Sequence, residues 1–79
     1  MSGNDLVVLK NRKLISETEQ AILIGDKHTP LRYSGMRGKT WIPRVFVSDP
    51  FPFDDIGAVA DVEIPRWVAE QNDLDHEEV

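Results

Sequence analysis

The sequence predicts a small antiparallel fold, all-β to α+β: a rolled sheet or half-open barrel of about four to five strands with one short C-terminal helix. Short apolar, β-branched runs recur along the chain and are separated by turn-forming residues. After Pro65 the apolar residues change to helical spacing. The 79 residues leave room for one hydrophobic core. We therefore expect a single domain over residues 1–79, with its core over about 5–72.

The first half of the chain predicts two strands. The first covers Asp5–Ile15, and Asn11 at its centre indicates a bend or bulge. Residues 16–19 are polar and predict a tight connection. The five residues 20–24 form a short apolar run that fits a buried strand, and Gly25–Asp26 is a turn signal.

Residues 26–39 are the least regular part of the sequence and predict a long loop or a loosely paired hairpin. Thr40–Ser48 then predicts a strand, because its Trp, Ile, Val, Phe and Thr residues have high β-propensity. Pro43 cannot donate a hydrogen bond to a neighbouring strand, so this strand should lie at an edge or carry a bulge there.

The last third predicts a turn, a strand and the helix. Residues 49–55 form a proline-punctuated turn, and residues 58–64 a final strand. Pro65 suits the first position of a helix. Trp67 and Val68 should fill the open end of the sheet, and Asn72–Asp73 should end the helix. Residues 73–79 are expected to be a frayed acidic tail, apart from Leu74, which folds back.

Composition excludes several classes of protein. The chain has no cysteine, which removes disulfides, thiolate nucleophiles and cysteine-based zinc sites. No apolar run approaches the ~20 residues of a membrane span, and Met1–Asp5 lacks the regions of a signal peptide. These observations predict a cytoplasmic protein with no membrane partner.

The net charge of −5 hides an asymmetry between the two halves. Residues 1–48 carry eight Lys and Arg against four Asp and Glu, a net charge of +4. Residues 49–79 carry ten acids against Arg66 alone, a net charge of −9. The acidic balance argues against nucleic-acid binding by the whole surface, but it leaves a local basic region in the first half.

The sequence indicates neither a metal site nor a catalytic site. His28 and His76 have no metal-ligand spacing. Asp49 and the pair Asp54–Asp55 are interrupted by phenylalanines and prolines, which favours a solvated turn. Residues 35–40 end like a phosphate-binding loop, but Tyr33 stands where its first glycine is required. We expect a protein that is not an enzyme and that uses no cofactor.

Three motifs carry a resemblance to a known group of proteins. They are Glu17–Ile24, Trp41–Pro43 and Ile64–Gln71. In this order they resemble short, uncharacterised proteins of bacteriophages, prophages and plasmids, which have a T-E-x-A strand, a W-I-P strand and an I-P-x-W-x-A-E ending. The resemblance implies a mobile-element origin and a β-rich fold, without an activity. That group follows W-I-P with Lys-Ser, where this chain has Arg44-Val45.

Two surfaces are candidates for binding. The aromatic turn, with its acidic flank, would contact a protein partner; its residues are Phe51, Phe53, Asp54 and Asp55. The same phenylalanines would equally suit a cap folded onto the core. The basic loop interleaves cations with aromatic rings, as in single-stranded nucleic-acid binding; its residues are Arg32, Tyr33, Arg37, Lys39 and Arg44, with Trp41 beside them.

We therefore expect a small interaction protein that binds a host or phage protein. It could inhibit a nucleic-acid-handling or defence complex, with its acidic ending imitating a phosphate backbone. A single-stranded nucleic-acid-binding accessory domain is the first alternative. A structural component of a virion or of a toxin–antitoxin pair is the second.

Overall fold

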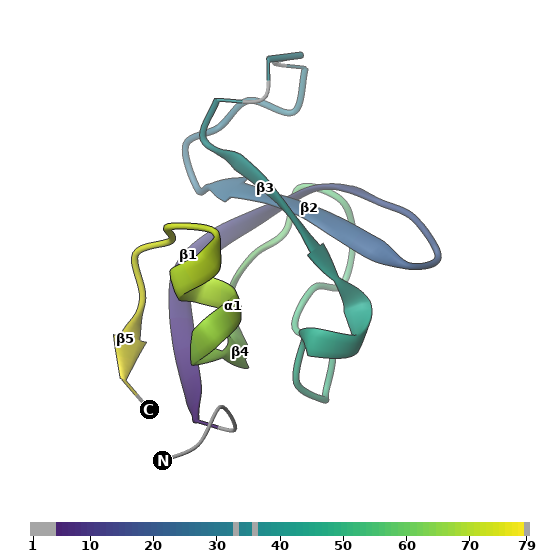
Figure 1. The fold of residues 1–79 in the computed structure, drawn as a ribbon. Helices are drawn as coiled ribbons and strands as arrows, with labels where there is room; N and C mark the ends of the chain where they lie inside the picture. The colour runs from purple at the N-terminus through teal and green to yellow at the C-terminus, as the bar shows by residue number, and fades with distance from the viewer. Residues whose placement is uncertain (1–4, 33, 36, 79) are drawn as a thin grey trace.

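The fold is an antiparallel sheet that is not closed into a barrel, with one short helix near its C-terminal end (Figure 1). The computed structural model describes residues 5–32, 34–35 and 37–78, of residue 78 the backbone alone. The strands are β1 (Leu6–Glu17), β2 (Ala21–Asp26), β3 (Lys39–Pro43), β4 (Val59–Pro65) and β5 (Glu77–Glu78). Their order is β3-β2-β1-β4, and β5 pairs with β1. The 3-10 helix η1 (Arg44–Phe46) follows β3, and α1 (Arg66–Gln71) follows β4. The predicted fold class is confirmed.

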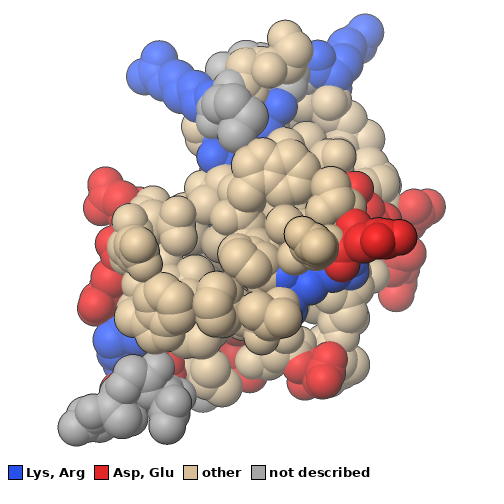
Figure 2. Space-filling model, turned by 45° about the vertical axis from the view of Figure 1, so that its right-hand side comes forward, with Lys and Arg blue, Asp and Glu red and all other residues tan. Residues whose placement is uncertain are grey.

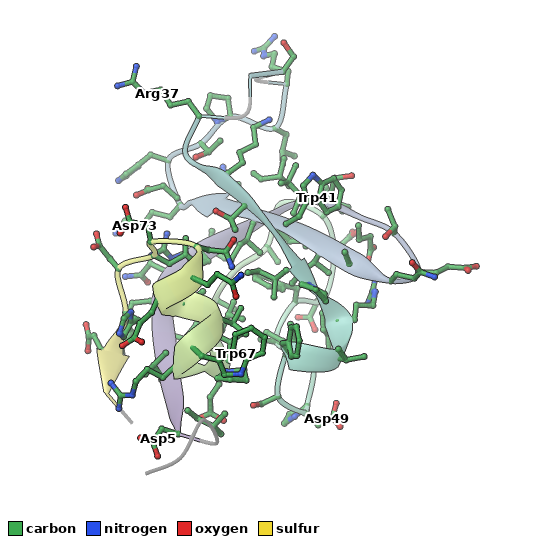
Figure 3. All side chains as sticks on the ribbon, in the orientation of Figure 1. Asp5, Arg37, Trp41, Asp49, Trp67 and Asp73 are labelled. Carbon is green, nitrogen blue, oxygen red and sulfur yellow. The ribbon has the colours of Figure 1, made fainter. Side chains whose placement is uncertain are left out.

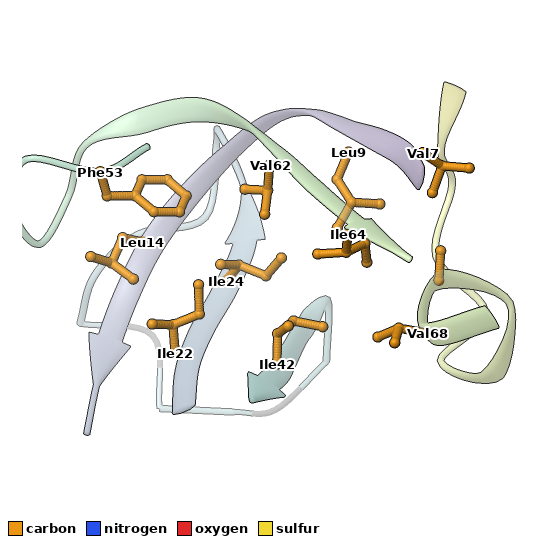
Figure 4. Packing of buried hydrophobic residues seen from close by; sticks show 11 residues of the cluster. Val7, Leu9, Leu14, Ile22, Ile24, Ile42, Phe53, Val62, Ile64 and Val68 are labelled. Atoms are coloured by element: carbon orange, nitrogen blue, oxygen red, sulfur yellow. The ribbon is translucent and has the colours of Figure 1, made fainter. Parts of the chain in front are cut away.

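The core lies on one face of the curled sheet and is filled by apolar residues of every long strand. Full burial of such a side chain contributes about 1.5–3 kcal/mol. Phe53 closes one end of this core and Val68 of α1 closes the other (Figure 4). The buried cluster is Val7, Leu9, Leu14, Ile22, Ile24, Ile42, Phe53, Val62, Ile64, Val68 and Ala69.

The bend predicted at Asn11 is a β-bulge in the long strand β1. Asn11 has φ 53°, in the left-handed region that asparagine tolerates. The β1–β4 register shifts between Leu9 and Arg12. The Asn11 backbone N–H donates to Asp61 Oδ1 at 3.0 Å, which supplies an acceptor for a group that the bulge takes out of the ladder. β4 pairs with β1 on both sides of the bulge, whereas β5 pairs only with the first half of β1 and β2 only with its second half.

Several boundaries differ from those predicted. β1 continues to Glu17, and Thr18 closes the turn by accepting the backbone N–H of Ala21 on its hydroxyl at 3.0 Å. Gly25 and Asp26 belong to β2 rather than to a turn, because they pair with Lys13 and Arg12 of β1. A cross-strand partner outweighed the local turn propensity.

Pro43 ends β3, where the sequence predicted that a strand would continue to Ser48. Its conformation, φ −58° and ψ 137°, leads into η1. β3 is the outermost strand of the path, so the edge position predicted from Pro43 is confirmed. The Arg44 backbone N–H donates to Gln20 O at 2.8 Å. Because alternate residues of a strand point their N–H groups to opposite sides, the missing N–H of Pro43 falls on the side away from β2.

The helix α1 begins at Arg66, one residue later than predicted, because Pro65 still pairs with Leu6 as the last residue of β4. Val68 is 2% exposed, as expected for a core residue. The prediction for Trp67 was wrong, because 44% of this residue is exposed. Asn72 ends the helix, and Asp73 follows with φ 57°.

The C-terminal residues form a strand instead of the frayed tail that was predicted. The Leu74 N–H donates to Ala69 O at 2.9 Å, which turns the chain back as expected. β5 then pairs with Val7 and Val8 of β1. Arg12 Nη2 donates to Asp75 O at 2.9 Å and holds the connecting segment. This pairing gives partners to backbone N–H and C=O groups on the edge of β1 that β2 does not cover.

Candidate functional site

The aromatic turn predicted to bind a partner is mainly a cap on the core. Phe53 is 5% exposed and belongs to the buried cluster, so its prediction as a surface anchor was wrong. Phe51 is 37% exposed and meets the Phe53 ring edge-on, with centroids 5.8 Å apart. Asp54 and Asp55 are exposed, and Asp55 Oδ1 accepts the Ile56 N–H at 2.8 Å within the turn. Phe53 therefore fills this end of the core, and Phe51 covers it from the outside.

The residues predicted for nucleic-acid binding do not form one group. Arg44 follows the end of β3, whereas Lys39 begins that strand. Arg44 Nη2 forms an ion pair with Glu17 Oε1 at 2.5 Å, and the Arg44 guanidinium carbon lies 5.1 Å from the centroid of the Phe51 ring. Arg32 and Arg37 are exposed in the loop between β2 and β3. Tyr33, which was predicted with them, lies outside the described residues. Arg44 therefore belongs to the turn that caps the core.

Trp41 is exposed on the sheet face that points away from the core. It alternates along β3 with the fully buried Ile42 and shares its face with Lys39. In the β2–β3 register Trp41 lies opposite Leu23, which is 6% exposed. The ring thus covers Leu23 and keeps 42% of its residue surface in water. Figure 3 shows Trp41 on the side of the molecule that carries the loop with Arg37.

A second exposed apolar surface lies where η1 meets α1. It consists of Val45, Phe46 and Trp67, and we name it the η1–α1 patch. Val45 is 84% exposed and Trp67 44% exposed. The Phe46 and Trp67 rings meet edge-on with centroids 5.1 Å apart, a favoured aromatic geometry. This arrangement was not predicted from the sequence.

The patch belongs to a largely uncharged face. Figure 2 shows tan residues across the middle of this face, with Asp and Glu along its two sides; Lys and Arg project at its upper end, and smaller basic areas lie at the lower left and right of the centre. Two ion pairs lie on the elements that bear the patch: Arg44–Glu17, and Arg66–Asp5 at 3.6 Å. An apolar centre with a charged border is the usual anatomy of a protein-binding surface.

A shallow hollow lies between β1, β4 and the segment 48–52, with a volume of about 310 Å³. Lys10 Nζ lies 3.4 Å from Asp61 Oδ2 at this hollow. The Asn11 backbone N–H, together with Lys10, holds the pKa of Asp61 below its usual value. This ion pair and the N–H contact stabilise the carboxylate within the bulge, which is a structural role.

Among the described residues, no three His, Cys, Asp or Glu side chains gather in a way that could hold a metal ion. No helix in the part of the chain that the structure describes has the length and apolar character needed to span a membrane. No protein family, curated protein or solved structure matches this chain.

Proposed function

We propose that this protein is a non-enzymatic binding module and that it docks a protein partner through the η1–α1 patch. The observation that carries the proposal is that Val45 and Trp67 are exposed on two elements, η1 and α1, which the edge-on contact of Phe46 with Trp67 brings together. Clustered exposed apolar residues on a small domain are typical of interaction sites.

The composition of the patch supports this proposal. Trp is among the residues most often found to dominate binding energy in protein interfaces. Trp67 would present a flat apolar ring, and Val45 a small aliphatic group beside Phe46 in the chain, whose ring contacts Trp67. Both would lose water on docking, at about 25 cal/mol for each Å² of apolar surface covered.

The rigidity of the patch supports it further. Phe46 meets the Trp67 ring edge-on, so the indole is already held in place before a partner arrives. Val68 and Ala69, the next residues of α1, are 2% and 0% exposed and anchor the helix in the core. A side chain that is ordered in advance loses less conformational entropy on binding.

The partner proposed first is a host or phage protein, on the strength of the resemblance to mobile-element proteins. Inhibition of a host nucleic-acid-handling or defence complex is one form that such binding could take. The acidic second half of the chain would then face a cationic groove of that complex.

The test is capture of partners from host lysate on the immobilised full-length chain. Val45→Glu places a charge in the patch at a position that is 84% exposed, so the fold should tolerate it. Val59→Glu is the matched control: Val59 is 46% exposed and lies at the end of β4 away from α1.

We expect the wild type and Val59→Glu to retain the same stoichiometric partner and Val45→Glu to lose it. Retention of that partner by Val45→Glu would exclude the patch as its binding site. Failure of the wild type to retain a partner from any host tested would argue against a binding module altogether.

A further inference from the structure

The loop between β2 and β3 forms a basic end of the molecule. Residues 27–39 contain no Asp or Glu, and their four cationic residues are Lys27, Arg32, Arg37 and Lys39. Figure 2 shows Lys and Arg projecting at this end, whereas Asp and Glu lie along the sides and toward the other end. We name residues 27–39 with Trp41 the basic pole. The net negative charge of the chain is therefore carried elsewhere on the surface.

The stem of this loop is fixed to the sheet. Lys13 Nζ donates to Thr29 O at 2.8 Å, and the Thr29 N–H donates to Asp26 O at 2.9 Å. The His28 N–H donates to Asp26 Oδ1 at 2.9 Å. Gly25 lets the two sides of the stem approach, since a Cβ there would lie 3.1 Å from Thr29 Oγ1 and 3.4 Å from Gly38 O. The position of the loop relative to β3 is thus set by its base.

Trp41 supplies an aromatic platform beside these cations. Lys39 and Trp41 lie two residues apart on the solvent face of β3, so their side chains leave the sheet on the same side. In Figure 3 the labelled Arg37 and Trp41 both lie in the upper part of the molecule, above α1. Leu23 supports Trp41 from the neighbouring strand.

We propose that the basic pole binds single-stranded nucleic acid, with a base stacked on Trp41 and phosphates bound by Arg32, Arg37 and Lys39. A cationic surface that follows the backbone, next to an aromatic ring that accepts any base, is the general arrangement for such binding. An acidic peptide would satisfy the cations but would leave the exposed indole face without a flat partner. Arg44 takes no part, because it is paired with Glu17 at the other end of β3. This site is separate from the η1–α1 patch and does not rest on the function proposed for it.

The test is fluorescence anisotropy of a labelled oligothymidylate of about eight nucleotides with the full-length chain. With three to four phosphate contacts, raising salt from about 50 to about 200 mM should weaken binding about 20- to 50-fold. Arg37→Gln should lower the slope of log affinity against log salt by about 0.7. Lys10→Gln is the matched control, since it removes one positive charge from a lysine paired with Asp61 and should leave the slope unchanged.

The stacking contact is tested separately. Trp41→Leu keeps an apolar cover over Leu23 and should weaken binding about 5- to 150-fold, whereas Trp41→Phe keeps an aromatic ring and should retain most of the affinity. Circular dichroism checks that each variant is folded.

Polyglutamate and an abasic oligonucleotide serve as competitors. Both should compete poorly, and the abasic strand should bind the wild type and Trp41→Leu equally. The absence of oligothymidylate binding at about 50 mM salt would overturn the proposal. Equal competition by polyglutamate, or wild-type affinity in Trp41→Leu, would also overturn it by showing that the pole binds anionic chains without reading a base.

Discussion

Phe51 and Phe53 stand two residues apart in one turn, yet they should differ sharply in their contribution to stability. Phe53 is 5% exposed at one end of the core, and replacing such a phenylalanine by alanine costs about 3–5 kcal/mol. Phe51 is 37% exposed and loses less buried area, so Phe51→Ala should cost about 1–2 kcal/mol. A chain of 79 residues has a free energy of unfolding of about 4–12 kcal/mol. Phe53→Ala would therefore remove a large share of it.

The assay is equilibrium unfolding in urea, followed by tryptophan fluorescence. At a slope of about 1 kcal/mol per molar urea, the midpoint of Phe53→Ala should lie about 2 M below that of Phe51→Ala. The edge-on contact of the two rings should appear as a coupling of about 0.5–1.5 kcal/mol in the double-mutant cycle. Equal losses in the free energy of unfolding of the two single variants would refute the assignment of Phe53 to the core. The partner-binding role first predicted for Phe53 would then have to be considered again.

Three further predictions concern the elements around the core. Trp67→Ala should lower the free energy of unfolding by about 2–3 kcal/mol, less than the loss of a fully buried tryptophan, because this residue is 44% exposed; urea unfolding measures it, and a larger loss would contradict that exposure. Gly57→Ala should cost about 1–2 kcal/mol in thermal unfolding, because Gly57 has φ 92°, and an unchanged melting temperature would contradict this backbone conformation. The Asn11 N–H lowers the folded-state pKa of Asp61. The contribution of the Asp61 carboxylate to the free energy of unfolding is therefore complete above its unfolded-state pKa and is lost as pH falls below about 4. The free energy of unfolding of Asp61→Asn should therefore depend less steeply on pH over that range than that of the wild type. An unchanged pH dependence would show that Asp61 does not contribute to acid unfolding.

Features that depend on one residue's own backbone chemistry could be predicted from the sequence. Asn11 tolerates a left-handed conformation and marks the bulge in β1. Pro43 lacks an N–H and marks the edge strand. Pro65 separates β4 from α1, although it ends the strand instead of beginning the helix. In each case the local restriction holds whatever the rest of the chain does.

Features that depend on distant partners could not be predicted in this way. Trp67 and Val68 are neighbours at the start of the same short helix. Which of the two side chains faces the core depends on how α1 is oriented at the end of β4. The strand β5 has two residues, too few for any periodicity, and it exists because the edge of β1 at Val7 and Val8 was open.

The candidate site was predicted only in part for the same reason. The loop with Arg32 and Arg37 was identified by its composition, which the fold does not alter. The removal of Arg44 from that group required knowledge of its pairing with Glu17, 27 residues away in sequence. The η1–α1 patch brings Phe46 against Trp67, and this contact depends on where the fold places η1 relative to α1.

The central claim is that a protein partner docks on the η1–α1 patch. The most direct measurement is the dissociation constant of the captured partner for the wild type, Val45→Glu and Val59→Glu, determined by isothermal titration calorimetry on the purified proteins. A charge at a position that the partner buries should cost at least about 2 kcal/mol, so Val45→Glu should bind about 30-fold more weakly or worse, with Val59→Glu unchanged. Equal dissociation constants for the three proteins would contradict the claim.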